Sequence, residues 1–224
     1  MAGHPKKTIH NLDNLSMMIF YLVPSGQARK AVPAPLKVAE VLPGMTMGGL
    51  YAARYGASGK ESVNEFGVLR AYVSHYDKKG FFISEFRSHD ARKGCSDAEF
   101  SWVSEGGAVS LTVSSGGQSL ISIKMRPTPI EVPVKSNFPF VCIKEGGSIF
   151  FQNHYVSKLG VSRTTVKIPD GSPLKGIPLG VKLMSAYWDA SNIVMMEQEY
   201  APKRGIKAVD NALGTPMGRL HKLK

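Results

Sequence analysis

The residues of this sequence best suited to chemistry are two adjacent cations, Arg92 and Lys93, in the stretch HDARKG at positions 89–94. A lysine amine acts as a nucleophile only when it is unprotonated, and both burial and a nearby fixed cation favour the neutral amine. Arg92 would supply such a cation, because a guanidinium stays protonated. The pair is compatible with an activated lysine, but the polar composition of the stretch by itself is more typical of a surface loop.

Two neighbouring features bear on this choice. In a regular strand, adjacent side chains point to opposite faces, so Arg92 and Lys93 share a face only if a turn or bulge intervenes. Gly94 makes such a turn plausible. Asp90, two positions before Arg92, would favour the protonated form of the lysine if the two side chains met.

No other segment matches the residue spacing of a motif with known chemistry. The glycine-rich segment 44–52 lacks the Gly-Lys-Ser/Thr of a phosphate loop, and Gly48 and Gly49 are better explained by a close backbone approach in a strand. The histidines are scattered, and His89, Asp90 and Cys95 do not match a zinc pattern. Two cysteines cannot form a disulfide framework. We therefore expect no metal and no cofactor.

The elements that must position these residues are mostly strands. Short apolar or alternating runs separated by Gly-rich turns predict an antiparallel barrel or sandwich. The expected strands cover residues 16–22, 64–76, 80–86, 98–104, 108–114, 119–125, 140–156, 161–168 and 192–200. Helical signal is confined to residues 25–32, with Ser25 as a possible N-cap, and to residues 179–188.

Composition sets the domain and partner expectations. With 224 residues and 43% hydrophobic content, residues 1–200 are expected to form one domain, followed by a basic tail at 201–224. The net charge is +11, and residues 203–224 carry six basic residues against one acidic residue. No nucleic-acid-binding motif accompanies this charge, so we expect no specific nucleic-acid partner. No apolar run resembles a signal peptide or a membrane span, which favours a cytoplasmic protein without a membrane partner.

Three stretches together resemble the acetoacetate decarboxylase family. They are FYLVPSGQARKAVPAPLKV at 20–38, a central block with VNEFGVLRAYV, FFISEF and ARKG, and SPLKGIPLGVKLMSAYWDASNIVMMEQEY at 172–200. They occur in the family's order across residues 16–200. The resemblance implies a mainly β fold: a closed, cone-like antiparallel β-barrel or double sheet around a central cavity, with a few peripheral helices. It also implies a homo-oligomer.

The resemblance implies a Schiff-base lysine acting on a small keto acid, with a carboxylate that moves protons or orients the substrate. Glu65 in SVNEFGV is similar to the glutamate that faces the family's cavity. The family has two consecutive lysines, the first of which is the nucleophile, whereas this sequence has Arg92 and then Lys93. The family's aromatic-proline lead-in is also missing. We expect the apolar cavity wall to include Phe20, Phe82, Trp102 and Phe151.

Three alternatives follow from this departure. Lys93 can serve as the amine, with Arg92 as its cation and Glu65 as the acid, which makes the protein a carbon–carbon lyase. Alternatively, Arg92 can anchor the carboxylate of a small organic acid in a protein that binds without decarboxylating, or that catalyses another reaction. The third alternative is a plain polar surface loop between two strands at positions 88–97.

Overall fold

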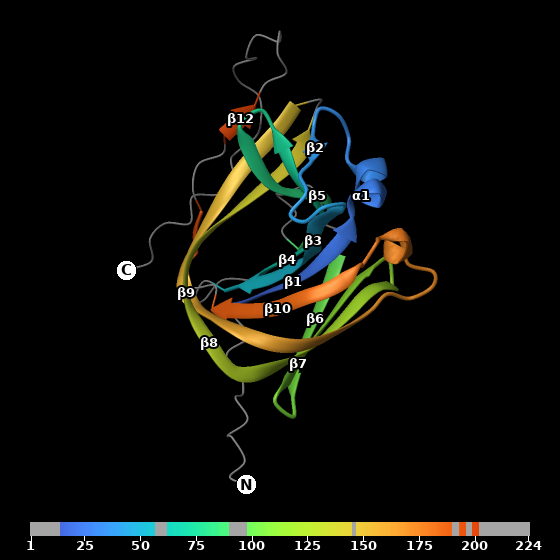
Figure 1. Ribbon diagram of the computed structural model, residues 1–224. Coiled ribbons are helices and arrows are strands. Elements are labelled where there is room, and N and C mark those ends of the chain that lie inside the picture. The colour runs from blue at the N-terminus through green and yellow to red at the C-terminus, as the bar shows by residue number, and fades with distance from the viewer. Residues whose placement is uncertain are drawn as a thin grey trace.

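A computed structural model describes residues 14–56, 62–89, 98–144, 147–189, 193–195 and 199–201. Within them, twelve strands form one sheet, in the order β11-β9-β10-β1-β3-β4-β5-β8-β7-β6, with β12 on β9 and β2 on β4. Figure 1 shows β8 and β9 as a long curved pair on one side of the molecule, with α1 on the other. The strands are β1 (Asn14–Pro24), β2 (Lys37–Val38), β3 (Met45–Tyr55), β4 (Val63–His75), β5 (Lys78–Ser88), β6 (Ala98–Glu105), β7 (Ala108–Ser115), β8 (Gln118–Lys144), β9 (Gly147–Lys167), β10 (Val181–Asp189), β11 (Ile193–Met195) and β12 (Glu199–Ala201).

The mainly β class is confirmed, but a closed barrel is not. β8 pairs with both β9 and β5, yet only two parallel residue pairs join it to β5. Helical structure in the described residues is limited to α1 (Ser25–Ala31) and the 3-10 turn η2 (Pro173–Gly176). None of these helices is long and apolar enough to cross a membrane. The division into a domain at 1–200 and a tail at 201–224 stays a prediction.

Two expectations about helices were wrong. Residues 181–189 form strand β10 and pair with β1, because a ten-residue apolar run has no periodicity that separates a strand from a buried helix. Ser25 is the first residue of α1 and not its cap; Pro24 precedes it, and no side chain caps the helix. The hairpin between β4 and β5 is confirmed, as are the positive φ angles of the Gly106–Gly107 and Gly116–Gly117 turns.

Strand β1 is buried on both faces, which explains its continuous apolar sequence. Alternate residues from Leu15 to Val23 belong to the larger hydrophobic cluster, called here the main core. Met18 and Phe20 point the other way, into a second cluster. We call this second cluster the aromatic face: Met18, Phe20, Tyr51, Ala53, Leu69, Phe81, Phe140 and Trp188. The sheet therefore separates two apolar layers.

A β-bulge in β4 decides which side chains reach each layer. Phe66 and Val68 lie in the main core, and so do Ala71 and Val73, although the two pairs differ in parity. The register shifts on either side of Leu69 supply the extra residue. Without the bulge, a period of two would place Ala71 and Val73 on the same face as Glu65.

Gly49 shows the close backbone approach expected from the glycine-rich segment. A methyl group on Gly49 would lie 2.3 Å from the carbonyl oxygen of Ile19 on the neighbouring strand. That distance is far inside van der Waals contact, so β1 and β3 pack here only because the residue has no side chain.

Candidate functional site

Four buried residues, three of them polar, lie side by side on neighbouring strands at the edge of the aromatic face. Ser16 pairs with Ala53, Ala53 with Glu65, and Glu65 with Ser88. Directly opposed residues in a sheet point to the same face. Glu65 is only 3% exposed, and the other three are fully buried. A carboxyl group therefore lies in a largely apolar layer, where burial is costly without hydrogen-bond donors.

A donor for Glu65 comes from the adjacent strand. The Tyr55 hydroxyl donates a hydrogen bond to Glu65 Oε2, and the hydroxyl groups of Tyr51 and Tyr55 are 2.8 Å apart. Since the proton of Tyr55 is used toward Glu65, the oxygen of Tyr55 accepts the proton of Tyr51. The result is an oriented chain from Tyr51 through Tyr55 to Glu65, which we call the tyrosine chain.

The environment of Tyr55 keeps its hydroxyl protonated. Burial, followed by the charge of Glu65, raises the pKa of Tyr55 well above its ordinary value. Both causes act against the phenolate, because one penalises any charge and the other penalises a second negative charge. Tyr55 is therefore a permanent donor and not an acid at neutral pH.

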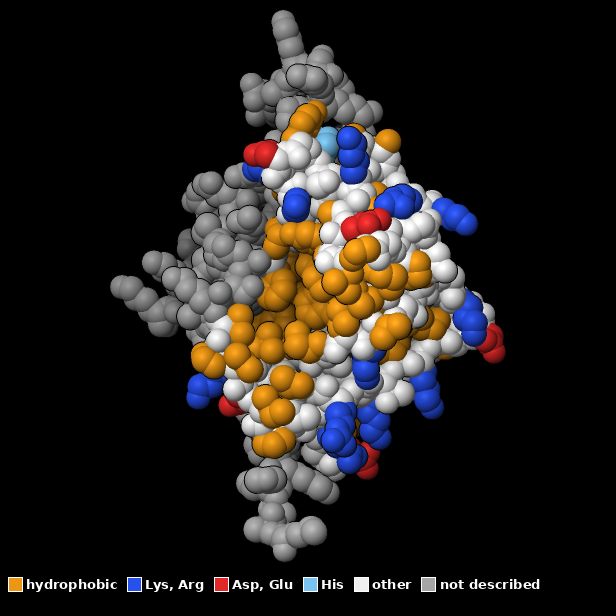
Figure 2. All heavy atoms as spheres, viewed as in Figure 1, with side chains coloured by type: hydrophobic (Ala, Val, Ile, Leu, Met, Phe, Trp, Pro, Cys, Tyr) orange, Lys and Arg blue, Asp and Glu red, His pale blue; other side chains and the backbone are white. Residues whose placement is uncertain are grey.

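Aromatic rings extend from the tyrosine chain across the face. Tyr51 lies 6.0 Å from Phe140 between ring centroids. Phe20 lies 5.8 Å from Phe81 and 6.1 Å from Phe138, and Phe138 stacks on Trp188 at 6.3 Å. Figure 2 shows hydrophobic side chains gathered around a hollow in the middle of the visible surface.

The structure describes only part of the predicted site. Arg92 and Lys93 lie outside the described residues, and so does Cys95. The backbone at the start of that stretch is fixed, because His89 N donates to Asn64 O at 3.0 Å. Asn64 immediately precedes Glu65, so the chain leaves the described part of the sheet beside this carboxyl group. The described residues contain no group of three potential metal ligands.

The expected apolar wall divides between the two layers. Phe20 lies on the aromatic face. Phe82 belongs to the main core, and Trp102 packs against that core. The sequence does not separate these side chains, because it does not show which face of its strand each residue occupies. The side chain of Phe151 lies outside the described residues.

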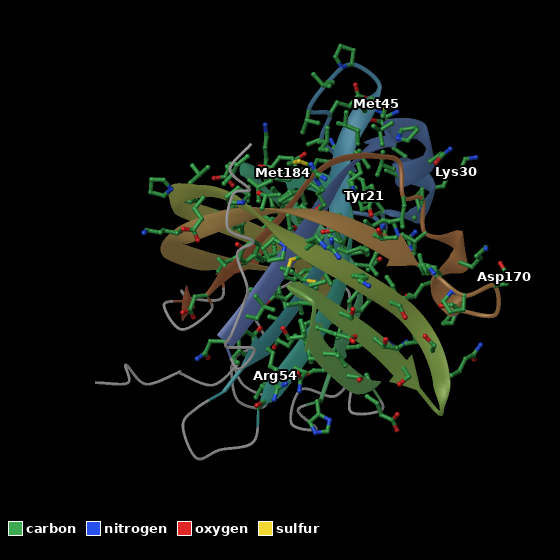
Figure 3. The ribbon with its side chains drawn as sticks, turned by 90° about the horizontal axis from the view of Figure 1, so that it is seen from below. Tyr21, Lys30, Met45, Arg54, Asp170 and Met184 are labelled. Atoms are coloured by element: carbon green, nitrogen blue, oxygen red, sulfur yellow. The ribbon has the colours of Figure 1, made fainter. Side chains whose placement is uncertain are left out.

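Tyr51 and Tyr55 were not predicted from the sequence as site residues. Their signal was present in the segment YAARY, since residues four apart in a strand share a face. What the sequence could not show is that β3 pairs with β4 in the register that places Ala53 opposite Glu65. Arg54, between the two tyrosines in sequence, lies at the opposite end of β3 from Met45 (Figure 3).

This arrangement of strands is an acetoacetate decarboxylase-like fold, in a divergent form. The crystal structure of acetoacetate decarboxylase from Legionella pneumophila matches with a TM-score of 0.59 and 11% identity, over 90% of this chain and 93% of that chain. The enduracididine biosynthesis enzyme MppR, complexed with pyruvate, matches with a TM-score of 0.58 and 10% identity, over 84% and 88%. An acetoacetate decarboxylase-like enzyme from Sphingomonas wittichii matches with a TM-score of 0.51 and 13% identity, over 87% and 100%.

At these identities the likeness concerns the fold. No family model matches the sequence, and no curated protein sequence matches it. The resemblance read from the sequence is therefore confirmed as a resemblance of fold, while the roles of Glu65, Arg92 and Lys93 stay predictions.

Proposed function

We propose that this acetoacetate decarboxylase-like protein acts on a small keto acid as a carbon–carbon lyase. One observation carries the proposal: the Glu65 carboxyl group, 3% exposed, lies at the edge of the aromatic face and accepts a hydrogen bond from Tyr55. A carboxyl group buried against apolar side chains costs stability, and such groups concentrate at functional sites. The pyruvate complex of MppR supports a keto acid as the ligand class.

In the proposed reaction, Lys93 provides the amine and Arg92 its neighbouring cation. The amine attacks the ketone carbon, and loss of water gives an iminium ion. Carbon dioxide then leaves, and the electron pair of the broken carbon–carbon bond moves toward the iminium nitrogen to give an enamine. Glu65 takes up a proton from solvent and passes it to the enamine carbon, and water then hydrolyses the resulting iminium ion, which releases the ketone and restores the amine.

Two features of the described residues agree with this assignment. His89, four residues before Lys93, is held at the strand that carries Glu65. The Ser16 hydroxyl lies in the same row as Glu65, is fully buried, and makes no hydrogen bond in the described part of the chain. It can therefore donate to a bound carboxylate or carbonyl oxygen.

The proposal is tested by trapping the iminium ion. The protein is incubated with pyruvate or acetoacetate and sodium borohydride, and the modified peptide is located by mass spectrometry. We expect a reduced adduct on Lys93 and release of carbon dioxide from acetoacetate. Lys93→Gln should lose both. The control Lys30→Gln removes an exposed lysine on α1 (Figure 3) and should retain both.

The same protein distinguishes the binding alternative. If no adduct forms and no carbon dioxide is released, yet pyruvate raises the melting temperature of the wild type and not of Arg92→Gln, then Arg92 is a carboxylate anchor. The protein is then not a lyase of this type. Absence of adduct, carbon dioxide and thermal shift together would exclude keto acids as ligands.

A further inference from the structure

We propose that Tyr55 and Tyr51 are positioning residues that act through Glu65. The tyrosine chain fixes the orientation of the Glu65 carboxylate and keeps a donor on Oε2. The part concerning catalysis rests on the proposed function, because it assumes that Glu65 moves a proton at the keto-acid site. The direction of the hydrogen bonds in the tyrosine chain is argued from the described residues alone.

The geometry makes the chain directional. Tyr55 Oη is within hydrogen-bond reach of both Tyr51 and Glu65, and a phenol has one proton to donate. The carboxylate takes that proton, since a hydrogen bond to an ionised acceptor is stronger than one to a neutral hydroxyl. Tyr51 must then donate to Tyr55. Each hydroxyl group in the chain therefore has one preferred orientation.

Both ends of the tyrosine chain are buried. Tyr51 is 5% exposed and Glu65 is 3% exposed, while Tyr55 between them is half-buried. Tyr51 packs on Phe140 and pairs with Gly67 on the neighbouring strand. Water therefore competes little for these hydrogen bonds. A carboxylate held this way loses fewer orientations than a solvated one when a substrate binds, which is the requirement for a group that transfers a proton at one carbon atom.

The tyrosine chain predicts a graded response to substitution along its length. Tyr55→Phe removes a hydrogen bond to a charged group, an interaction whose loss corresponds to about 10- to 100-fold in rate if it is realised in the transition state. Tyr51→Phe leaves Tyr55 as a donor and should cost only about 2- to 5-fold, the part due to mutual polarisation. Glu65→Gln should reduce kcat by about 10²- to 10⁴-fold.

A double variant tests whether Tyr55 acts through Glu65. Acetoacetate turnover is measured for Tyr55→Phe, Glu65→Gln and the combination. We expect Tyr55→Phe to lower kcat with little change in KM, and to add almost nothing in the Glu65→Gln background, because the group it positions is already gone. Additive effects, or an unchanged kcat in Tyr55→Phe, would overturn the positioning role.

A second measurement does not depend on activity. Buried tyrosine hydroxyl protons are followed by NMR; we expect a downfield Tyr55 signal that disappears in Tyr55→Phe and moves in both Tyr51→Phe and Glu65→Gln. If the wild type shows no turnover, the proposed function fails. The chemical shifts still test whether the hydrogen bonds of the tyrosine chain exist. If Glu65→Gln does not shift the Tyr55 signal, the tyrosine chain is overturned.

The control is Tyr187→Phe. Tyr187 lies in the main core, and its hydroxyl is buried and makes no hydrogen bond in the described part of the chain. Its removal should leave both kcat and the Tyr55 signal unchanged, which separates the loss of a particular hydroxyl from the general effect of a tyrosine-to-phenylalanine change.

Discussion

Asn64 joins the two sides of the stretch that carries Arg92 and Lys93. Its carbonyl oxygen accepts from His89 N, before the stretch, and its side-chain oxygen accepts from Trp102 Nε1, after it, each at 3.0 Å. One residue thus fixes both the end of β5 and strand β6 against β4. Glu65 is the next residue along β4. The same contacts therefore link the residue with the candidate carboxyl group to both flanks of the stretch that carries Arg92 and Lys93.

We expect Asn64 and Trp102 to be energetically coupled. In a double-mutant cycle with Asn64→Ala and Trp102→Phe, the hydrogen bond should appear as an interaction energy of about 1 kcal/mol in urea unfolding. The exposed pair Ser114 and Glu99, joined at 3.3 Å across neighbouring strands, is the control. Its coupling should be close to zero. Equal couplings in the two pairs would contradict the assignment.

The Gly49 contact predicts an asymmetric response to alanine. Gly49→Ala should reduce the free energy of unfolding by about 3 kcal/mol, because the new methyl group meets the backbone carbonyl of Ile19, which cannot move without disturbing the pairing of β1. Gly26→Ala, in α1, has nothing within 4 Å and should be neutral or stabilise by about 0.5 kcal/mol. Denaturant midpoints compare the two, and a tolerated Gly49→Ala would show that the strands are farther apart.

His75 predicts a loss of stability on acidification. Burial lowers the pKa of His75, and its Nδ1 lies 2.6 Å from Ser148 Oγ. Just below the ordinary histidine value of about 6.5, the unfolded chain therefore binds a proton that the folded chain does not, so stability falls as the pH drops through that window and is regained toward neutral pH. The melting temperature, measured between pH 7 and about pH 5.5, should fall less in His75→Gln than in the wild type.

The exposed histidine His89 provides the comparison for that experiment. His89→Gln should retain the pH dependence of the wild type, because the side chain at this position is exposed. An identical slope in His75→Gln and wild type would show that other groups cause the acid response.

Strands β8 and β9 place two like charges opposite each other. Arg126 pairs directly with Arg163, and both are exposed. Opposed like charges destabilise a sheet, so Arg163→Glu should raise the free energy of unfolding by about 0.5 kcal/mol at low salt, and by less at high salt. Lys79→Glu makes the same change in net charge opposite Ser74 and should gain less. A larger gain in the free energy of unfolding for Lys79→Glu than for Arg163→Glu would show that net charge causes the effect.

The sequence alone predicted most of the strands and the Gly-Gly turns, and it offered Glu65 as a candidate, because these follow from alternation, turn chemistry and local resemblance. It could not assign layers. A bulge at Leu69 reverses the parity of β4, and strand register sets which side chains are neighbours. For this reason Phe82 and Trp102 were expected beside Phe20, and Tyr51 and Tyr55 were overlooked.

Only the tertiary structure brought Tyr55, from β3, to Glu65, from β4, across a ten-residue separation. The physical reason is that sequence patterns record which residues avoid water, whereas hydrogen-bond partners depend on the pairing of strands that are distant along the chain. The fold class could therefore be predicted from local patterns, while the tyrosine chain that holds the candidate carboxyl group became visible only when the strands were paired.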